Sequence, residues 1–286
     1  MHTGLEFTRH DNGALLVTQD ASIGRSASVV GVSHLSRVSE PIHEDFFRPL
    51  EAGDESNPVD PTVYSSLTGM LVQFLKTRHD VRQFISYLCS YNSSPCEGHY
   101  RRALHLLRFL HSTPGQGCVF KSCGGVLFSS SDAAHGLFLN GKSSTAFFLS
   151  IGEHNAPFVC SAKSQPIVAT CPMTAEYYAA GSTCSEIIHY RQLSSDLGWP
   201  LSLPTVLAVD NKTAMNLANA PEVSRKSRHI FIKHHWIREL VANGLIRLVH
   251  VSTKLMRANV LTKYLPPRQF SIQSDSLFNR SALPSK

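Results

Sequence analysis

The sequence predicts an α/β protein in which a mixed sheet with flanking helices follows a mainly helical segment. Between residues 64 and 111, apolar residues recur at spacings of three and four, as on one face of a helix. After the turn at Thr113-Pro114-Gly115 the pattern changes to short runs typical of strands. Three such runs are followed by alternating helical and strand-like segments, an order that indicates a mixed α/β sheet.

The N-terminal part contains a predicted hairpin, an acidic loop and three helices. Asp11-Asn12-Gly13 is a favourable turn between the runs LEF and ALLV. Residues 51–61 are acidic and rich in turn formers, which predicts an exposed loop. The predicted helices are SLTGMLVQFL (66–75), VRQFISYLCSY (81–91) and HYRRALHLLRFL (99–110). The last has a basic face, which is either solvated or in contact with a nucleic-acid backbone.

The second half is predicted to alternate between strands and helices. Its predicted strands are VLFSSSD (126–132), TAFFLSI (145–151), APFVCSA (156–162), TVLAVD (205–210) and LIRLVHV (245–251). Its predicted helices cover residues 174–197, 211–220, 229–240 and 257–265. In the last of these, RANVLTKYL, Asn259 is also a good N-cap residue.

Composition and charge favour an intracellular protein that contacts an anionic partner. The seven cysteines are scattered without a close pair, which argues against a disulfide framework or a zinc ribbon. Apolar runs stay well below the roughly 20 residues of a membrane span, so no membrane partner is expected. Residues 1–60 carry four Arg and ten acids, about −6; residues 212–286 carry thirteen Lys and Arg and three acids, about +10. A basic region suits a phosphate backbone, although an ordinary solvated basic surface is the alternative.

Three acids stand where an α/β sheet usually gathers functional groups. Asp132 and Asp210 end predicted strands, and Glu176 lies near the start of the long helix. Such positions face a crevice while the backbone is held rigidly. Three carboxylates can hold hard divalent cations such as Mg²⁺. Each acid also has an ordinary explanation: Glu176 could complement a helix N-terminus, Asp210 could cap the next helix, and Asp132 could be a loop residue.

Many ordered motifs resemble the C-terminal part of a copia-type LTR retrotransposon polyprotein. YSSLTGMLVQFLKTRHDV resembles Y-x-S-L-x-G-x-L-x-Y-x-x-x-T-R-P-D-I, and HYRRALHLLRFLHSTPGQG resembles H-W-x-A-x-x-x-x-L-R-Y-L-x-G-T. SSSDAAHG stands for Y-S-D-A-D-W, MTAEYYAA for T-E-A-E-Y-x-A and AVDNKTAMNLANAP for C-D-N-x-S-A-x-x-L-A-x-N-P. KSRHIFIKHHWIRE is similar to R-T-K-H-I-D-I-x-x-H-F-I-R-E, and RANVLTKYLP to x-A-D-x-L-T-K-x-L-P.

The resemblance implies three regions. Residues 1–116 would be the C-terminal or connection segment of a reverse transcriptase, without the polymerase Y-x-D-D motif, so DNA polymerisation is not expected. Residues 117–266 would form an RNase H-like domain that cleaves the RNA strand of an RNA–DNA hybrid. Residues 267–286 are expected to be a disordered tail. The rest of a reverse transcriptase polyprotein is the implied protein partner.

The resemblance also implies a metal site with one altered position. Asp132, Glu176 and Asp210 correspond to three of four acids that hold two Mg²⁺ ions, for which Mn²⁺ can substitute, and the fourth position is Asn259. An amide can coordinate Mg²⁺ but adds no negative charge, so we expect weakened, metal-demanding hydrolysis. The alternative is a degenerate remnant that binds nucleic acid or a polymerase partner without catalysis. Further departures from the family pattern, which favour this alternative, are Ala134, Thr174 and Phe231; Cys160 stands where Trp is usual.

A basic stretch before and within the helix at 229–240 is the predicted nucleic-acid contact. Its residues are Lys226, Arg228, His229, Lys233 and Arg238. These side chains would bind phosphates, so their removal should weaken binding in a salt-dependent way. A zinc site among His229, His234 and His235 is less favoured, because His229 and His234 are five residues apart.

Overall fold

The chain folds into two compact units in this computed structural model. Unit 1 comprises Met1–Lys121 and Tyr264–Lys286, and unit 2 comprises Ser122–Lys263. The structure describes residues 4–44, 46–47, 50, 56–138, 140–212, 215 and 231–284, with the side chains of 231–235 left out. Within these described residues, no helix combines the length and apolar character that crossing a membrane requires.

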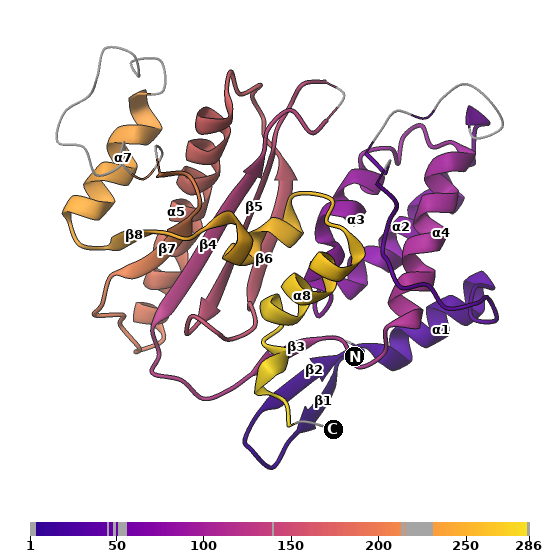
Figure 1. Ribbon diagram of the computed structural model, residues 1–286, viewed down its shortest axis with the longest axis horizontal. Coiled ribbons are helices and arrows are strands. Elements are labelled where there is room, and N and C mark those ends of the chain that lie inside the picture. The colour runs from indigo at the N-terminus through magenta and orange to yellow at the C-terminus, as the bar shows by residue number, and fades with distance from the viewer. Residues whose placement is uncertain are drawn as a thin grey trace. The chain divides into compact units, whose positions relative to one another are not determined.

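Unit 2 is built on a mixed five-stranded sheet with the order β6-β5-β4-β7-β8 (Figure 1). Central strand β4 pairs antiparallel with β5 and parallel with β7, while β7 pairs parallel with β8. The strands are β4 (Leu127–Ala134), β5 (Ser144–Ile151), β6 (Val159–Ser164), β7 (Thr205–Val209) and β8 (Ile246–His250). All five were predicted from the sequence. The predicted mixed α/β sheet with flanking helices is confirmed.

Two helices, α5 (Pro172–Asp196) and α7 (Phe231–Ala242), cover one face of this sheet. Successive side chains of a strand point to opposite faces, and β5 follows this rule. Phe147 and Leu149 join the core cluster that includes Tyr177 of α5. Phe148 lies on the other face, where the Arg257 guanidinium is 4.8 Å from its ring centroid. In Figure 1 the segment after β8 accordingly crosses the sheet on the side opposite α5.

The helix predicted for residues 257–265 is wrong in type and length. The chain forms one short 3₁₀ helix there, η5 (Arg257–Leu261), which follows another, η4 (Thr253–Leu255). A helix this short gains little from its own hydrogen bonds, so tertiary contacts decide its form. Asn259 lies inside η5, whose N-cap is Met256, so the N-cap interpretation of Asn259 is also wrong. The helix predicted at 211–220 lies largely outside the described residues, as does the start of the helix predicted at 229–240.

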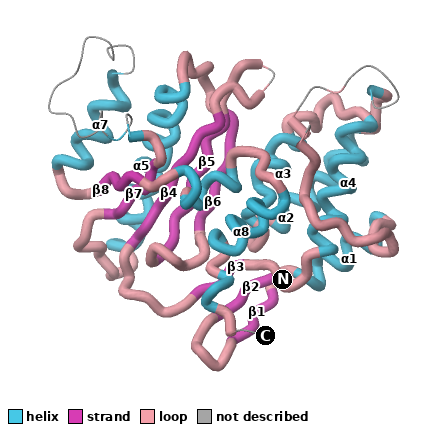
Figure 2. The backbone as a smooth tube through the Cα atoms, in the orientation of Figure 1, coloured by secondary structure: helices cyan, strands magenta, loops and turns pink. Residues whose placement is uncertain are grey.

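Unit 1 contains a second, three-stranded sheet with the order β1-β2-β3, visible in Figure 2. Its strands are β1 (Glu6–Arg9), β2 (Leu15–Thr18) and β3 (Cys118–Phe120), all antiparallel. The predicted hairpin is confirmed. Helix α1 (Asp20–Val30) was not predicted, because its sequence DASIGRSASVV is rich in small and polar residues and buries only Ile23 and Ala27.

The predicted helical layer is present in unit 1. It consists of α2 (Pro61–Phe74), η2 (His79–Val81), α3 (Arg82–Cys89) and α4 (Glu97–Ser112). A fully buried ion pair fixes the turn before α3: Arg78 donates from Nε and Nη2 to the two carboxylate oxygens of Asp80, at 3.1 and 2.9 Å. Arg78 also donates to the Thr113 hydroxyl at 2.8 Å, which ties this turn to the end of α4. That these helices are a reverse-transcriptase connection stays a prediction.

The expectation of a disordered tail at 267–286 is wrong for its described residues. They form α8 (Pro267–Leu277) and η6 (Arg280–Ala282), which belong to unit 1. Phe270 is 4% exposed and packs against Phe84 and Phe109, with ring centroids 6.3 and 5.9 Å away. The Ser- and Pro-rich composition concealed a helix that buries Phe270 and, seven residues later, Leu277.

Candidate metal centre

Strand pairing places two aspartates side by side. In the parallel register of β4 and β7, Ser130 is opposite Ala208. Continuing this register by two residues brings Asp132 opposite Asp210, just after the last residue of β7. Because side chains two residues apart share a face, both carboxylates lie on the same side of the sheet. Asp132 is therefore a strand residue and not a loop residue.

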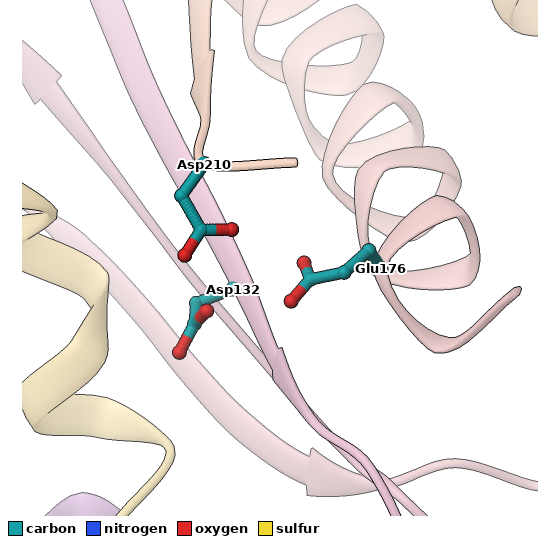
Figure 3. A group of neighbouring side chains, drawn as sticks. All are labelled: Asp132, Glu176 and Asp210. Atoms are coloured by element: carbon teal, nitrogen blue, oxygen red, sulfur yellow. The ribbon is translucent and has the colours of Figure 1, made fainter. Parts of the chain in front are cut away.

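Glu176 reaches the same place from the first turns of α5, which packs across β4 and β5. One ligand atom from each of Asp132, Glu176 and Asp210 lies within 4.8 Å of the other two. The three carboxylates point toward one another in Figure 3. Among the described residues, this is the one group of three or more His, Cys, Asp or Glu side chains with such a spacing. The structure thus brings together the three predicted acids.

The cluster concentrates negative charge in a partly dry environment. Burial, reinforced by the charges of Asp132 and Asp210, raises the pKa of Glu176 to about 9, although the Ala133 backbone N–H donates to its carboxylate. Burial also raises the pKa of Asp132, and the nearby Lys263 opposes that rise. A buried carboxylate is costly in its charged form unless a cation or donors compensate it. The arrangement therefore favours either protonation or a bound cation.

Each aspartate is held by a threonine hydroxyl. Thr262 Oγ1 donates to Asp132 Oδ2, and Thr253 Oγ1 donates to Asp210 Oδ2 at 3.0 Å. Lys263 Nζ lies 3.5 Å from the same Oδ2 of Asp132. Asp132 Oδ1 is buried and has no hydrogen-bond partner among the described residues. One oxygen of Asp132 is thus fixed, and the other is left for a ligand.

Asn259 is 1% exposed and is linked to both threonines. Its Nδ2 donates to the Thr253 carbonyl oxygen, and its own main-chain carbonyl accepts from the Thr262 backbone N–H at 3.1 Å. Its Oδ1 is buried without a hydrogen-bond partner in the described part of the chain. The amide therefore uses a donor that an aspartate at this position would lack. Its role as a fourth ligand stays a prediction.

The side chains of this cluster fit a hard divalent cation. Carboxylate oxygens are the ligands that Mg²⁺ and Mn²⁺ accept, and the three here are close enough to share an ion. The unpartnered Asp132 Oδ1 is the kind of buried acceptor that a cation satisfies. The acidic triad can therefore hold a metal ion.

Sequence comparison identifies proteins that are similar to this chain. It is 33% identical over 210 residues, 72% of its length, to the retrovirus-related Pol polyprotein from transposon RE2 of Arabidopsis thaliana. It is 33% identical over 215 residues, 74% of its length, to the corresponding polyprotein from transposon RE1 of the same plant. The chain is related to copia-type Pol polyproteins. The polyprotein from transposon TNT 1-94 of Nicotiana tabacum is 27% identical over 221 residues, 77% of the chain.

This Pol relative spans only 14% of the RE2 and RE1 polyproteins and 16% of the TNT 1-94 polyprotein. No family model matches its sequence. Among solved structures, it is similar to LC11-RNase H1, isolated from compost, with 15% identity over 49% of this chain and 94% of that one and a TM-score of 0.37. It is also similar to a foamy viral protease-reverse transcriptase in complex with dsDNA, with 11% identity, 73% and 41% coverage and a TM-score of 0.39.

The predicted nucleic-acid contacts of this chain are mostly outside the described structure. Lys226, Arg228 and His229 are not among the described residues, and Lys233 is described only as part of the backbone of α7. Arg238 is half-buried on α7, and its charge lowers the otherwise raised pKa of Tyr177. The structure therefore places one of the five side chains, and their contact with nucleic acid stays a prediction.

Three residues that contact the acid cluster were not predicted from the sequence: Thr253, Thr262 and Lys263. Thr262 and Lys263 belong to RANVLTKYLP, the motif that drew attention to Asn259. Their match to the L-T-K of the family pattern was the available signal, but it does not indicate which atoms they contact. Thr262 contacts Asp132, which lies 130 residues earlier in the sequence, and Thr253 contacts Asp210, which lies 43 residues earlier.

Proposed function

We propose that unit 2 hydrolyses the RNA strand of RNA–DNA hybrids, using divalent cations held by Asp132, Glu176 and Asp210. The main support for this proposal is the convergence of three carboxylates, two from the ends of strands and one from a helix. One ligand atom of each lies within 4.8 Å of the other two. The relationship to Pol polyproteins supports a nucleic-acid substrate. The formal charge of +6 suits an anionic duplex.

The residues of the chain would supply a rigid set of oxygen ligands. The hydroxyls of Thr262 and Thr253 fix the orientation of Asp132 and Asp210, and the Ala133 N–H does the same for Glu176. A fixed orientation lowers the cost of rearranging the ligands when the substrate arrives. A bound Mg²⁺ or Mn²⁺ supplies Lewis acidity toward the phosphodiester and lowers the pKa of a coordinated water.

The hybrid would be recognised mainly through its shape, its phosphates and its 2′-hydroxyls, with little base specificity. In the same proposal, the basic residues between 226 and 238 hold the duplex backbone, and unit 1 works beside the remaining parts of a reverse transcriptase. These partners are proposals because the chain is a short segment of its relatives.

A catalytically degenerate nucleic-acid binder is the second candidate. Asn259 favours it, because the neutral amide leaves the site one carboxylate short of the four that the family resemblance implies. The intact and converging triad favours hydrolysis. Binding without cleavage is the outcome that separates the two candidates.

Cleavage of an end-labelled RNA–DNA hybrid by the purified full chain, in Mg²⁺ and in Mn²⁺, tests the proposal. We expect slow cleavage of the RNA strand that falls by roughly a hundredfold or more in Asp210→Asn, since the variant removes a charged ligand. Asp196→Asn is the matched control, because Asp196 is exposed at the end of α5. An intact hybrid in both metals, or equal cleavage by Asp210→Asn, would show that the proposal is wrong.

A further inference from the structure

Lys263 brings a positive charge into the acid cluster. Its Nζ lies 3.5 Å from Asp132 Oδ2, and its side chain is 35% exposed while that of Asp132 is 1% exposed. The charge of Lys263 also acts on Glu176, whose pKa it lowers against the effect of burial. The ammonium group therefore interacts with two of the three candidate ligands.

The same contact limits how Asp132 can bind an ion. Its Oδ2 already accepts from Thr262 Oγ1 and faces the Lys263 ammonium. Its Oδ1 is the buried oxygen without a hydrogen-bond partner among the described residues. Asp132 can thus offer one oxygen freely, whereas bridging two cations would draw on both and would require Lys263 to move away.

The formal charge of the site also limits the number of divalent cations that it can bind. With an ion bound, all three carboxylates are ionised and contribute −3, the Lys263 ammonium contributes +1, and Asn259 contributes nothing, which leaves −2. One divalent cation neutralises that charge. A second would enter a site without excess negative charge and would meet the Lys263 ammonium at short range, where like charges repel strongly.

We propose that Lys263 is a built-in cation of this centre and that the centre therefore holds one tightly bound divalent ion instead of two. The inference rests on the proposed function only in using the same three carboxylates. The family pattern L-T-K also has a lysine at this position, so the revision of the two-ion expectation rests on Lys263 together with the missing charge at Asn259. Lys263 acts here through the charge that it places on Asp132 and is not itself a metal ligand.

Isothermal titration calorimetry of the full chain with MnCl₂ tests this inference. Wild type is expected to bind one ion tightly. Lys263→Met is expected to bind the first ion at least tenfold more tightly, to bind a second ion, or both. Lys263→Arg keeps the charge and should behave as wild type. Lys163→Met is the matched control, because Lys163 is an exposed lysine on β6.

The Met variant leaves Asp132 without its counter-charge, which could weaken folding. Lys263→Gln keeps a hydrogen-bond donor without the charge and replaces the Met variant in that case. A second readout is thermal unfolding, in which 1 mM Mn²⁺ should raise the midpoint more for the neutral variants than for wild type, by mass action.

The outcomes separate this inference from the proposed function. Two tight ions in wild type, or equal stoichiometry and affinity in wild type and the neutral variants, would overturn the role of Lys263, whether or not the hybrid is cut. Absence of ion binding in every variant, together with an intact hybrid, would overturn both. One ion in wild type and tighter or additional binding in the neutral variants supports the inference even where cleavage is undetectable.

Discussion

At the scale of single residues, Asn259 has two separable properties, its missing charge and its extra donor. The amide donates to the Thr253 carbonyl, and the backbone carbonyl of Asn259 accepts from Thr262. Those threonines hold Asp210 and Asp132. An aspartate here would restore a charge that the family resemblance implies. It would lose the Nδ2 donor to Thr253, the residue that holds Asp210, and it would keep the main-chain carbonyl that contacts Thr262.

Asn259→Asp should therefore lower stability without metal and strengthen the response to metal. Loss of a buried hydrogen bond and addition of a fourth nearby carboxylate should cost about 1–3 kcal/mol of unfolding free energy in EDTA. The added charge should enlarge the stabilisation by Mn²⁺. Urea denaturation with and without MnCl₂ measures both effects, with exposed Asn243→Asp as the control. Unchanged stability in EDTA would remove Asn259 from this supporting role.

The acids could be predicted at this scale, whereas their supporting contacts could not. Asp132 lies two residues before the end of β4 and Asp210 directly follows β7, so the predicted strands indicate where both side chains lie. Thr262 and Lys263 directly follow η5, a 3₁₀ helix that packs on β4 and β5. No local periodicity indicates that the hydroxyl of one and the ammonium of the other meet a carboxylate 130 residues away.

At the scale of elements, the start of α4 depends on a neutral histidine. His99 Nδ1 accepts from the Cys96 N–H at 3.2 Å, and its ring stacks on Tyr91 with centroids 3.8 Å apart. Burial, with a smaller contribution from the charge of Arg102, lowers the pKa of His99 to about 4. Protonation would place a proton on the accepting nitrogen and so disrupt this helix start.

The pKa of His99 predicts that stability falls in acid. An unfolded histidine titrates near 6.5, so between pH 6.5 and 4 the unfolded state binds more protons than the folded state. The free energy of unfolding should fall by on the order of 2 kcal/mol as the pH falls from 6.5 to 4. Above pH 6.5 the full stabilising contribution of the neutral His99 should be present. Urea denaturation of His99→Gln should show a smaller loss between pH 7.5 and 4.5, while exposed His34→Gln should follow wild type. Parallel curves for all three proteins would contradict this role.

Helix α8 supplies a second element-scale prediction, because its anchor is a single aromatic residue. Phe270→Ala should destabilise unit 1 by roughly 3–5 kcal/mol, since it opens a cavity between Phe84 and Phe109. Ile272→Ala is the control, because Ile272 is 60% exposed and should change stability by less than about 0.5 kcal/mol. Chemical denaturation compares the two. Equal, small effects would mean that α8 is not part of the folded unit in solution.

Elements with regular apolar spacing were predictable, and those fixed by distant contacts were not. The strands of unit 2 and helices α2 to α4 follow clear patterns in the sequence. Helix α1 buries two small stretches of apolar surface around Ile23 and Ala27, too few to give a periodic signal. Strand β3 has three residues and is defined by its pairing with β2, which no short window of sequence contains.

At the scale of the whole molecule, the chain returns to its first unit at its end. Val119 N–H donates to the Phe278 carbonyl at 3.0 Å, and Arg280 donates to the Gly115 carbonyl at 2.6 Å. The Asn12 amide donates to the Ala282 carbonyl at 2.8 Å. These contacts join segments more than 150 residues apart. Local sequence patterns do not reveal such contacts, and the last residues are therefore predicted to be a tail. Unit 2 is thus inserted between two parts of unit 1.

Charge along the whole chain predicts how binding to a hybrid depends on salt. The first 60 residues carry about −6 and residues 212–286 about +10, so phosphate contacts should concentrate in the later segment. Replacing Lys226, Arg228 and Lys233 together by Ala should lower the slope of log K against log salt by roughly two to three, since each phosphate contact contributes about 0.7–0.9. Fluorescence anisotropy with a labelled hybrid, in an Asp210→Asn background that prevents cleavage, measures this slope.

The matched control for that series is Lys163→Ala, which removes the positive charge of an exposed side chain on β6. It should leave the slope nearly unchanged, because a phosphate contact releases counterions and a distant charge does not. Arg238→Ala should have a smaller effect than the triple variant, because its half-buried side chain also packs in unit 2. A slope that falls equally in the triple variant and in Lys163→Ala would assign the effect to net charge and would remove the predicted contact surface.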